Sequence, residues 1–218
     1  MILDEYATSL EAMRQRLPEH AHVSTMTFTT TLTIVQDTLY AFLMSVSPEM
    51  LEKKGFTTIP NIKKSSFSNL AFDIQFYPDV APKVRARVFS TTGSIVITGC
   101  DTHLFAFLVV EDLERLFGVP ARYPEPKLVN VNFSLHVPLD IHTIATTIKD
   151  SVSFVELPEQ YSNRLIIGTP YGKIQIFGSG SVVIHASTYD TVAQTWACVS
   201  PAVLPRIPSL PEGPPQGV

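Results

Sequence analysis

The segment Gly93-Ser94-Ile95-Val96-Ile97-Thr98-Gly99 returns later in the chain as Gly180-Ser181-Val182-Val183-Ile184-His185-Ala186. Each copy follows an apolar segment that ends in phenylalanine. Repetition of this kind predicts that one structural unit occurs twice in the chain. Two strand-rich copies predict a pseudo-symmetric molecule with a paired surface, and duplex nucleic acid is the commonest ligand with matching two-fold character.

The composition predicts a globular protein with a sizeable core. Of 218 residues, 45% are hydrophobic and 17% charged, which excludes a disordered polyelectrolyte. The formal net charge of -4 gives no overall basic field, so any contact with nucleic acid must use a local basic patch or an apolar surface. Cys100 and Cys198 lack partners at metal-ligand spacing, so we expect buried free thiols, a reducing compartment and no metal site.

The sequence contains no evident export or membrane signal. Residues 1–5 are acidic where a secretory signal would be basic, and the longest strongly apolar run, residues 104–110, is too short to span a bilayer. We therefore expect an intracellular protein with no membrane partner.

Each copy is predicted to contain a long strand, a helix, three extended segments and a final helix. In the first copy these are residues 22–32, 34–46, 70–77, 83–90, 94–99 and 102–117. In the second copy they are residues 127–137, 139–149, 163–169, 172–177, 181–186 and 188–198. Two such units side by side predict an α+β fold, with one continuous curved antiparallel sheet and all helices on one face.

The domain organisation follows from the repeat. We expect a helical extension over residues 1–19, a first repeat over 20–118, a second repeat over 119–200 and a disordered proline-rich tail over 201–218. The first repeat carries a basic insertion at residues 53–68, which its glycine and proline predict to be a loop.

Helices on one face leave the other face of the sheet to be explained. Strand side chains alternate, so Val23 and Thr25 share one side of the first strand, and Asn130 and Asn132 share one side of its counterpart. The exposed face therefore combines apolar, hydroxyl and amide groups. A broad exposed face with apolar content is typical of a binding surface.

The repeated segments resemble the TATA-box binding protein family. Residues 88–99 (VFSTTGSIVITG) and 176–186 (IFGSGSVVIHA) are similar to its Ile-Phe-x-Ser-Gly-Lys-x-Val-x-Thr-Gly element. Residues 118–123 resemble the family's linker between repeats, and residues 139–145 resemble the start of its second-repeat helix. Val23-Ser24-Thr25 resembles a Val-Ser-Thr on its first strand.

This resemblance implies a saddle of two direct repeats, whose concave sheet binds and bends DNA from the minor groove. It implies double-stranded DNA, a IIB-type initiation factor and the RNA polymerase machinery as partners, with no cofactor and no small-molecule substrate. The divergence resembles that of a protein encoded by a large DNA virus, which implies a location in the nucleus or a cytoplasmic viral factory.

The family inserts phenylalanine pairs, seventeen residues apart, into the ends of its DNA site. By resemblance, the intercalating residues are Phe72, Phe89 and Phe177. The fourth position holds Gln160, beside Tyr161, so the sequence does not establish a fourth intercalating residue. Such rings exchange base stacking for a bent duplex that contacts more protein. The alternative is that these rings are core residues; exposure would distinguish the two.

The resemblance also implies a set of groove contacts: Val23, Thr25, Val96, Thr98, Asn130, Asn132, Val183 and His185. The family's two central asparagines are replaced by Ala21 and Leu128, and His185 replaces a threonine. An amide or imidazole acceptor can bind the guanine 2-amino group, which alone distinguishes G·C from A·T in the minor groove. We therefore expect an altered, asymmetric sequence preference. The alternative is that these are solvated sheet residues in a protein that has lost DNA binding.

Phosphate anchoring is expected to be sparse, because the family's turn lysines are missing. The candidate phosphate contacts are Lys83, Arg85, Arg87, Arg164 and Lys173, with the loop lysines Lys53, Lys54, Lys63 and Lys64. By resemblance, Glu156 and Glu159 are the candidate contacts for the IIB-type partner.

The two other functional classes to consider are an enzyme and a scaffold that binds only proteins. The chain has no paired carboxylates at informative spacing, no nucleophile elbow and no phosphate-binding glycine loop, so an enzyme is not expected. A scaffold that binds only proteins through the same fold remains the alternative function, and it would keep the candidate wedge rings packed.

Overall fold

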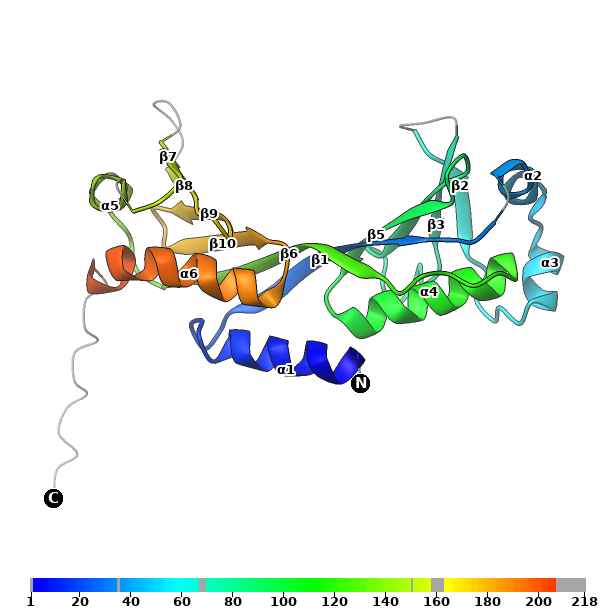
Figure 1. Cartoon of the computed structure of the whole chain (residues 1–218), viewed down its shortest axis with the longest axis horizontal. Helices are drawn as coiled ribbons and strands as arrows, with labels where there is room; N and C mark the ends of the chain where they lie inside the picture. Colours follow the sequence, from blue (N-terminus) through cyan, green and yellow to red (C-terminus); the bar gives the residue numbers. More distant parts are fainter. Residues whose placement is uncertain (1, 35, 67–69, 150, 158–162, 207–218) are drawn as a thin grey trace, which may run out of the picture. The chain divides into compact units, whose positions relative to one another are not determined.

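The computed structural model describes residues 2–34, 36–66, 70–149, 151–157 and 163–206 (Figure 1). Its contacts divide the chain into two compact units, which we describe separately. Unit 1 comprises Met1–Thr8 and Val23–Asn130, and unit 2 comprises Ser9–His22 and Val131–Val218. Helix α1 (Ile2–Arg14) and strand β6 (Glu125–Ser134) each contribute residues to both units.

The described parts of the two repeats have closely similar element orders. In the first they are β1 (His22–Thr31), α2 (Gln36–Ser45), α3 (Pro48–Lys53), β2 (Asn61–Lys64), β3 (Ala71–Gln75), β4 (Arg85–Phe89), β5 (Ser94–Cys100) and α4 (His103–Phe117). In the second they are β6, α5 (Ile141–Ile148), β7 (Phe154–Glu156), β8 (Arg164–Gly168), β9 (Gly172–Phe177), β10 (Ser181–Ala186) and α6 (Tyr189–Val203), followed by a 3-10 turn at Leu204–Arg206.

The described strands form one ten-stranded antiparallel sheet in the order β2-β3-β4-β5-β1-β6-β10-β9-β8-β7. Read inward from either edge, this order is the same in the two repeats. The predicted α+β class, with a repeated sheet and accompanying helices, is therefore confirmed. Among the described helices, none is both long and apolar enough to cross a bilayer.

The core of unit 1 lies between its strands and α4, which packs against β5. Thr102 caps α4 by accepting a hydrogen bond from the Phe105 backbone N–H, and Gly118 ends it with a left-handed φ of 71°. From Met26 onward every second side chain of β1 is buried, including Phe28, whose ring meets the His103 ring of α4 edge-on at 5.0 Å. Alternation thus assigns one strand face to the core.

The core of unit 2 is built in the same way, with α6 packed against β9 and β10. Thr188 and Thr191 form a reciprocal capping box that begins α6. Phe133 of β6 meets Trp196 of α6 edge-on at 5.0 Å between ring centres. The burial pattern of β6 is identical, position by position, to that of β1.

His103 connects the N-terminal helix to the core of unit 1. The Tyr6 ring of α1 stacks on the His103 ring at 3.5 Å between centres, and His103 is 5% exposed. Burial lowers the pKa of His103 to about 4, so the ring is neutral at neutral pH. The helical extension expected at the N-terminus is therefore anchored by an aromatic contact.

Two expectations about irregular segments were wrong. Within residues 53–68, expected to be a loop, Asn61–Lys64 forms strand β2, which pairs with β3 from Asn61↔Gln75 to Lys64↔Phe72. Residues 201–206, expected to be part of a disordered tail, are instead ordered: α6 continues through Val203 and a 3-10 turn follows to Arg206. The rest of that segment, residues 207–218, lies outside the described residues.

Candidate nucleic-acid interface

In each unit the strands present one face away from the helices, which we call the open face. Side chains on the core face are buried except at the starts of β1 and β6, whereas those of β1, β5, β6 and β10 on the open face are half-buried or exposed. In unit 1 the β1–β5 register pairs Thr29 with Val96 and Thr27 with Thr98 on this face. The open face of unit 1 therefore has a hydroxyl and apolar centre.

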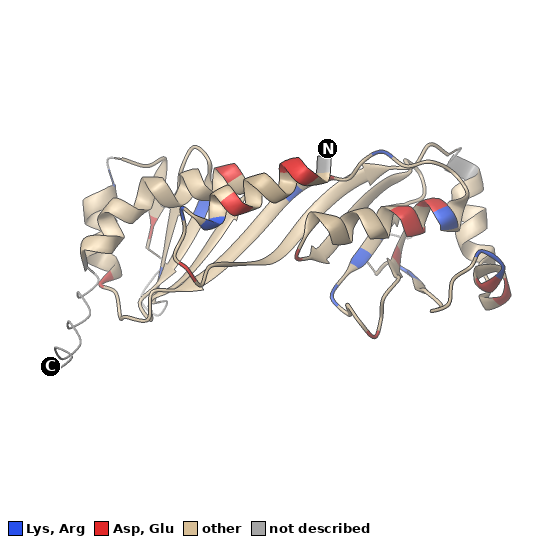
Figure 2. Cartoon of the chain, turned by 90° about the horizontal axis from the view of Figure 1, so that it is seen from below, with Lys and Arg blue, Asp and Glu red and all other residues tan. Residues whose placement is uncertain are grey.

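All eight predicted groove residues lie on an open face. Those of unit 1 are Val23, Thr25, Val96, Thr98 and Asn130. Those of unit 2 are Asn132, Val183 and His185. Figure 2 shows the long strands almost free of charged residues, which lie mainly on helices and at the outer strands and loops. Such a surface can contact base edges on the floor of a minor groove, whereas contact with an array of phosphates would require many cationic side chains.

Phe89 and Phe177 occupy equivalent places on the two open faces. Each is half-buried and ends its strand, β4 or β9, immediately before a tight turn. The residue directly opposite on the neighbouring strand is Ala71 for Phe89 and Arg164 for Phe177. Both rings are thus partly accessible on the open face, each at the end of a strand beside a turn.

Phe72 does not share this placement, which corrects the predicted set of wedges. Its side chain is only 3% exposed and its ring meets the Tyr40 ring of α2 at 5.6 Å. The β3–β4 register pairs Phe72 with the buried Val88. Phe72 is a core residue here, as the alternative interpretation of these rings proposed.

Arg87 is a weak candidate for binding phosphate because an acidic neighbour already compensates its charge. Its Nε and Nη2 donate to Asp73 Oδ1 and Oδ2 at 2.7 and 3.2 Å, a bidentate pair between β4 and β3. Hydrogen bonding to Asp73 is the main reason that the pKa of Arg87 is raised. We therefore leave Arg87 out of the proposed phosphate contacts.

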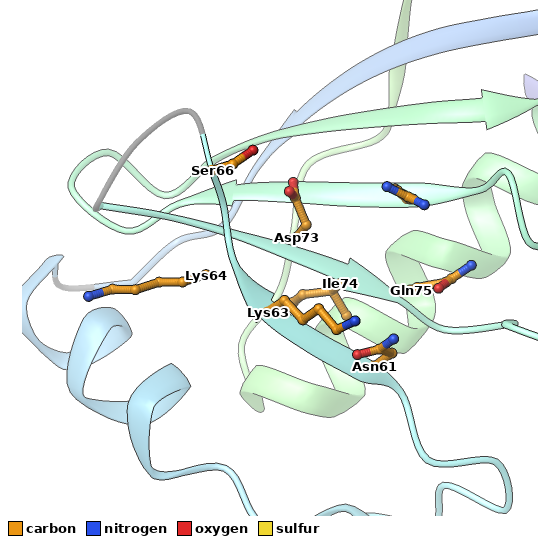
Figure 3. Close-up of a pocket in the computed structure, with 8 residues that line it drawn as sticks. Asn61, Lys63, Lys64, Ser66, Asp73, Ile74 and Gln75 are labelled. Carbon is orange, nitrogen blue, oxygen red and sulfur yellow. The ribbon is translucent and has the colours of Figure 1, made fainter.

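A basic pocket at the outer strands of unit 1 offers a better anion site (Figure 3). It holds about 190 Å³ and is lined by Asn61, Lys63, Lys64, Ser66, Asp73, Ile74, Gln75 and Arg85. Three of these side chains are cationic, and the one carboxylate belongs to the Asp73–Arg87 pair. Figure 3 shows Lys63 beside Asn61, while Lys64 points away from them toward α2. Lys64 Nζ lies 5.6 Å from the centre of the Tyr40 ring.

The open face of unit 2 carries a polar chain that crosses three strands. Arg164 Nη1 donates to Gln175 Oε1 at 3.5 Å, and Gln175 Nε2 lies 3.0 Å from His185 Nε2. Lys173 is exposed, opposite His185 in the β9–β10 register, with its Nζ 5.9 Å from the centre of the Phe154 ring. The remaining phosphate candidates Lys83 and Arg85 are exposed in unit 1.

Two residues of this face were missed from the sequence. Gln175 lies midway between Lys173 and Phe177, so the alternation that selected those two also selects it. Phe154 is 45% exposed on β7, and its ring covers Gly168 of the adjacent strand. No sequence motif marked Phe154, because β7 was not predicted.

The predicted partner contacts lie near β7. Glu156 is exposed on this strand, whereas Glu159 and the possible fourth wedge at Gln160 and Tyr161 lie outside the described residues. Beside Glu156, a groove of about 490 Å³ runs between α5 and β7. Its apolar lining includes Phe154 and Leu157, which are 45% and 40% exposed.

Comparison with solved structures supports the fold assignment. The structure matches "Methanococcus jannaschii TBP" with a TM-score of 0.58, covering 84% of this chain and 97% of that chain at 16% sequence identity. The chain therefore has a TBP-like fold. A match to "Crystal structure of the regulatory subunit of aspartate kinase from Thermus flavus" has a TM-score of 0.24 at 10% identity over 84% and 94% of the chains, too low to support an argument. No family model and no curated protein matches the sequence.

Proposed function

We propose that this protein binds and bends duplex DNA from the minor groove, as a divergent TATA-binding-protein-like transcription initiation factor. The observation that carries this proposal is the equivalent placement of Phe89 and Phe177, each at the end of its strand on the open face of its unit. Architectural proteins that bind the minor groove use wedge side chains beside a surface of apolar and polar groups that contacts the bases. The TBP-like fold is consistent with this use.

The partners, sequence preference and location of the protein follow as further parts of the proposal. A IIB-type initiation factor would contact Glu156 and the apolar groove between α5 and β7, which offer charge and an anchor pocket together. The polymerase machinery would then assemble in the nucleus or in a viral factory. The polar residues of unit 2 support a sequence preference that departs from A·T alone.

The proposal is tested by selecting bound duplexes from a random-sequence pool and measuring the end-to-end distance of enriched duplexes by fluorescence energy transfer. We expect enrichment of a short motif and a shorter end-to-end distance in the complex. Failure to enrich any motif, even at low salt, would contradict DNA binding by this chain.

The basic pocket predicts how affinity depends on salt. Removing Lys63 and Arg85 together as alanines should weaken binding to all duplexes alike and lower the slope of log affinity against log salt by about 0.9 for each lost phosphate contact. The control is Arg14→Ala/Lys149→Ala, which removes the same charge from exposed positions at the C-terminal ends of α1 and α5. An equal change of slope in the two double variants would mean that the pocket binds no phosphate. Measuring the DNA affinity of each variant at salt concentrations from about 50 to about 300 mM gives both slopes.

The scaffold alternative is favoured by the burial of Phe72 and by the apolar surface of α4. Leu104 and Leu108 are 56% and 39% exposed on α4, and Tyr123 beyond its end is 69% exposed. A protein partner could cover them without any DNA. The duplex selection described above separates the two functions.

A further inference from the structure

The Arg164–Gln175–His185 chain fixes how the Gln175 amide is oriented. A guanidinium group has only donors, so the atom facing Arg164 must be Oε1, and Nε2 must face His185. Gln175 Nε2 therefore donates, and His185 Nε2 accepts as part of a neutral ring with its proton on Nδ1. The amide is held at both ends, with the carbonyl oxygen at a defined place on the open face.

The electrostatic surroundings favour this arrangement. The pKa of His185 lies below its ordinary value of 6.5, mainly because the ring is partly buried and secondly because Lys173 carries a positive charge nearby. His185 is thus neutral at neutral pH, as an acceptor from Gln175 must be. The 3.5 Å contact with Arg164 is long for a hydrogen bond, so Gln175 Oε1 keeps most of its capacity to accept a second donor.

The equivalent position in unit 1 has different chemistry. Arg87 pairs with Val96 in the β4–β5 register as Gln175 pairs with Val183 in β9–β10. Arg87 is engaged by Asp73, and Thr98 stands where unit 2 has His185. This row of unit 1 thus has no side-chain amide to accept a hydrogen bond from a base.

A second acceptor lies in the same row of unit 2. The Leu32 N–H donates to Gly93 O, and the Leu135 N–H donates to Gly180 O in the same way. Leu135 therefore corresponds to Leu32, and three residues earlier on each strand Asn132 corresponds to Thr29. Thr29 pairs with Val96, so Asn132 occupies the place beside Val183, on the other side from Gln175. Asn132 Oδ1 is buried and has no hydrogen-bond partner among the described residues.

In the minor groove an acceptor discriminates between base pairs. Adenine N3 and thymine O2 are themselves acceptors and repel a carbonyl oxygen, whereas the guanine 2-amino group donates to it. We propose that Gln175, held by Arg164 and His185, reads the 2-amino group of a G·C pair in the half of the DNA site that unit 2 contacts. This inference rests on the proposed DNA-binding function and assigns its specificity to one residue.

The test compares guanine with inosine, which lacks only the 2-amino group. The probes are a duplex with an A·T-only centre and two derivative sets, in which each A·T pair is replaced singly by G·C or by I·C. We expect one position, in one half of the site, at which G·C binds about five- to tenfold tighter than I·C, the usual effect of one hydrogen bond. Gln175→Val should remove this difference, so that the variant binds the G·C and I·C duplexes with equal affinity at that position.

The matched control is Gln75→Val, which removes a glutamine from β3 of unit 1, where its Nε2 donates to Pro82 O at 2.8 Å. This variant should keep the difference between G·C and I·C. Equal affinities for G·C and I·C at every position, with binding to the A·T-only duplex intact, would overturn this inference and leave the proposed function standing. Absence of binding to every duplex at low salt would overturn both.

Discussion

Phe89→Ala/Phe177→Ala is expected to lose most of the DNA affinity and the ability to bend the duplex. Base stacking on an aromatic side chain contributes about 1–3 kcal/mol for each ring, so two rings together give roughly 2–6 kcal/mol, or about 30- to 20,000-fold in affinity. The two rings end equivalent strands of the two open faces, so each would open one base step. Equilibrium binding and fluorescence energy transfer between duplex ends measure the two losses.

Two further variants make this result specific. Phe89→Leu/Phe177→Leu keeps most of the apolar volume but cannot stack, so its affinity should fall between those of the wild type and the alanine variant. Tyr123→Ala removes a 69% exposed ring at the start of the segment that leads into β6 and should change neither quantity. Unchanged bending in the alanine variant, with native thermal unfolding, would contradict the wedge role and favour the protein scaffold.

The sequence predicted the repeat well because its signals are local. A strand that alternates with period two, a turn containing glycine and a threonine cap before a helix each act within a few residues. The same signals recur around residues 93–102 and 180–188, so one correct interpretation fixed two halves of the fold. The shared face of Val23 and Thr25 followed from this alternation, whereas Val96, Thr98 and Val183 were selected by the family resemblance.

The failure at Phe72 shows what local signals do not contain. Spacing of seventeen residues between Phe72 and Phe89 does not determine whether the rings share a face, because the face depends on the hairpin register. The structure pairs Ala71 with Phe89, which turns Phe72 to the opposite side and into contact with Tyr40. A shift of the hairpin by one residue reverses the outcome, and the length of the loop before Arg85 sets that shift.

Pairing across strands also explains the other differences. Asp73 neutralises Arg87 from fourteen residues away in sequence, because the β3–β4 register places the two side chains opposite each other. Strand β2 forms from a basic segment with modest strand propensity because β3 supplies its hydrogen-bond partners. The two open faces consequently differ more than their sequences suggested: unit 1 has a closed ion pair where unit 2 has an oriented amide.

Gly180→Ala is expected to destabilise the fold much more than Gly55→Ala, although both glycines have similar backbone angles. Their φ values are 88° and 82°, in the left-handed region that costs a residue with a Cβ about 1–2 kcal/mol. A Cβ on Gly55 would meet nothing within 4 Å, whereas one on Gly180 would lie 2.2 Å from the backbone oxygen of Val137. The difference between the two variants therefore isolates one steric contact.

The contact at Gly180 cannot be relieved by a side-chain rotation, because the obstructing atom belongs to the backbone. The Gly180 N–H donates to Phe177 O at 2.8 Å, and the Leu135 N–H donates to Gly180 O at 2.9 Å, so moving the turn strains both hydrogen bonds. We expect Gly180→Ala to lose about 3 kcal/mol or more of unfolding free energy, against about 1 kcal/mol for Gly55→Ala. Urea unfolding measures the two losses, and equal losses would show that Val137 yields freely. Because the same turn holds Phe177 at the end of β9, Gly180→Ala should also weaken binding to DNA, while Gly55→Ala should leave it unchanged.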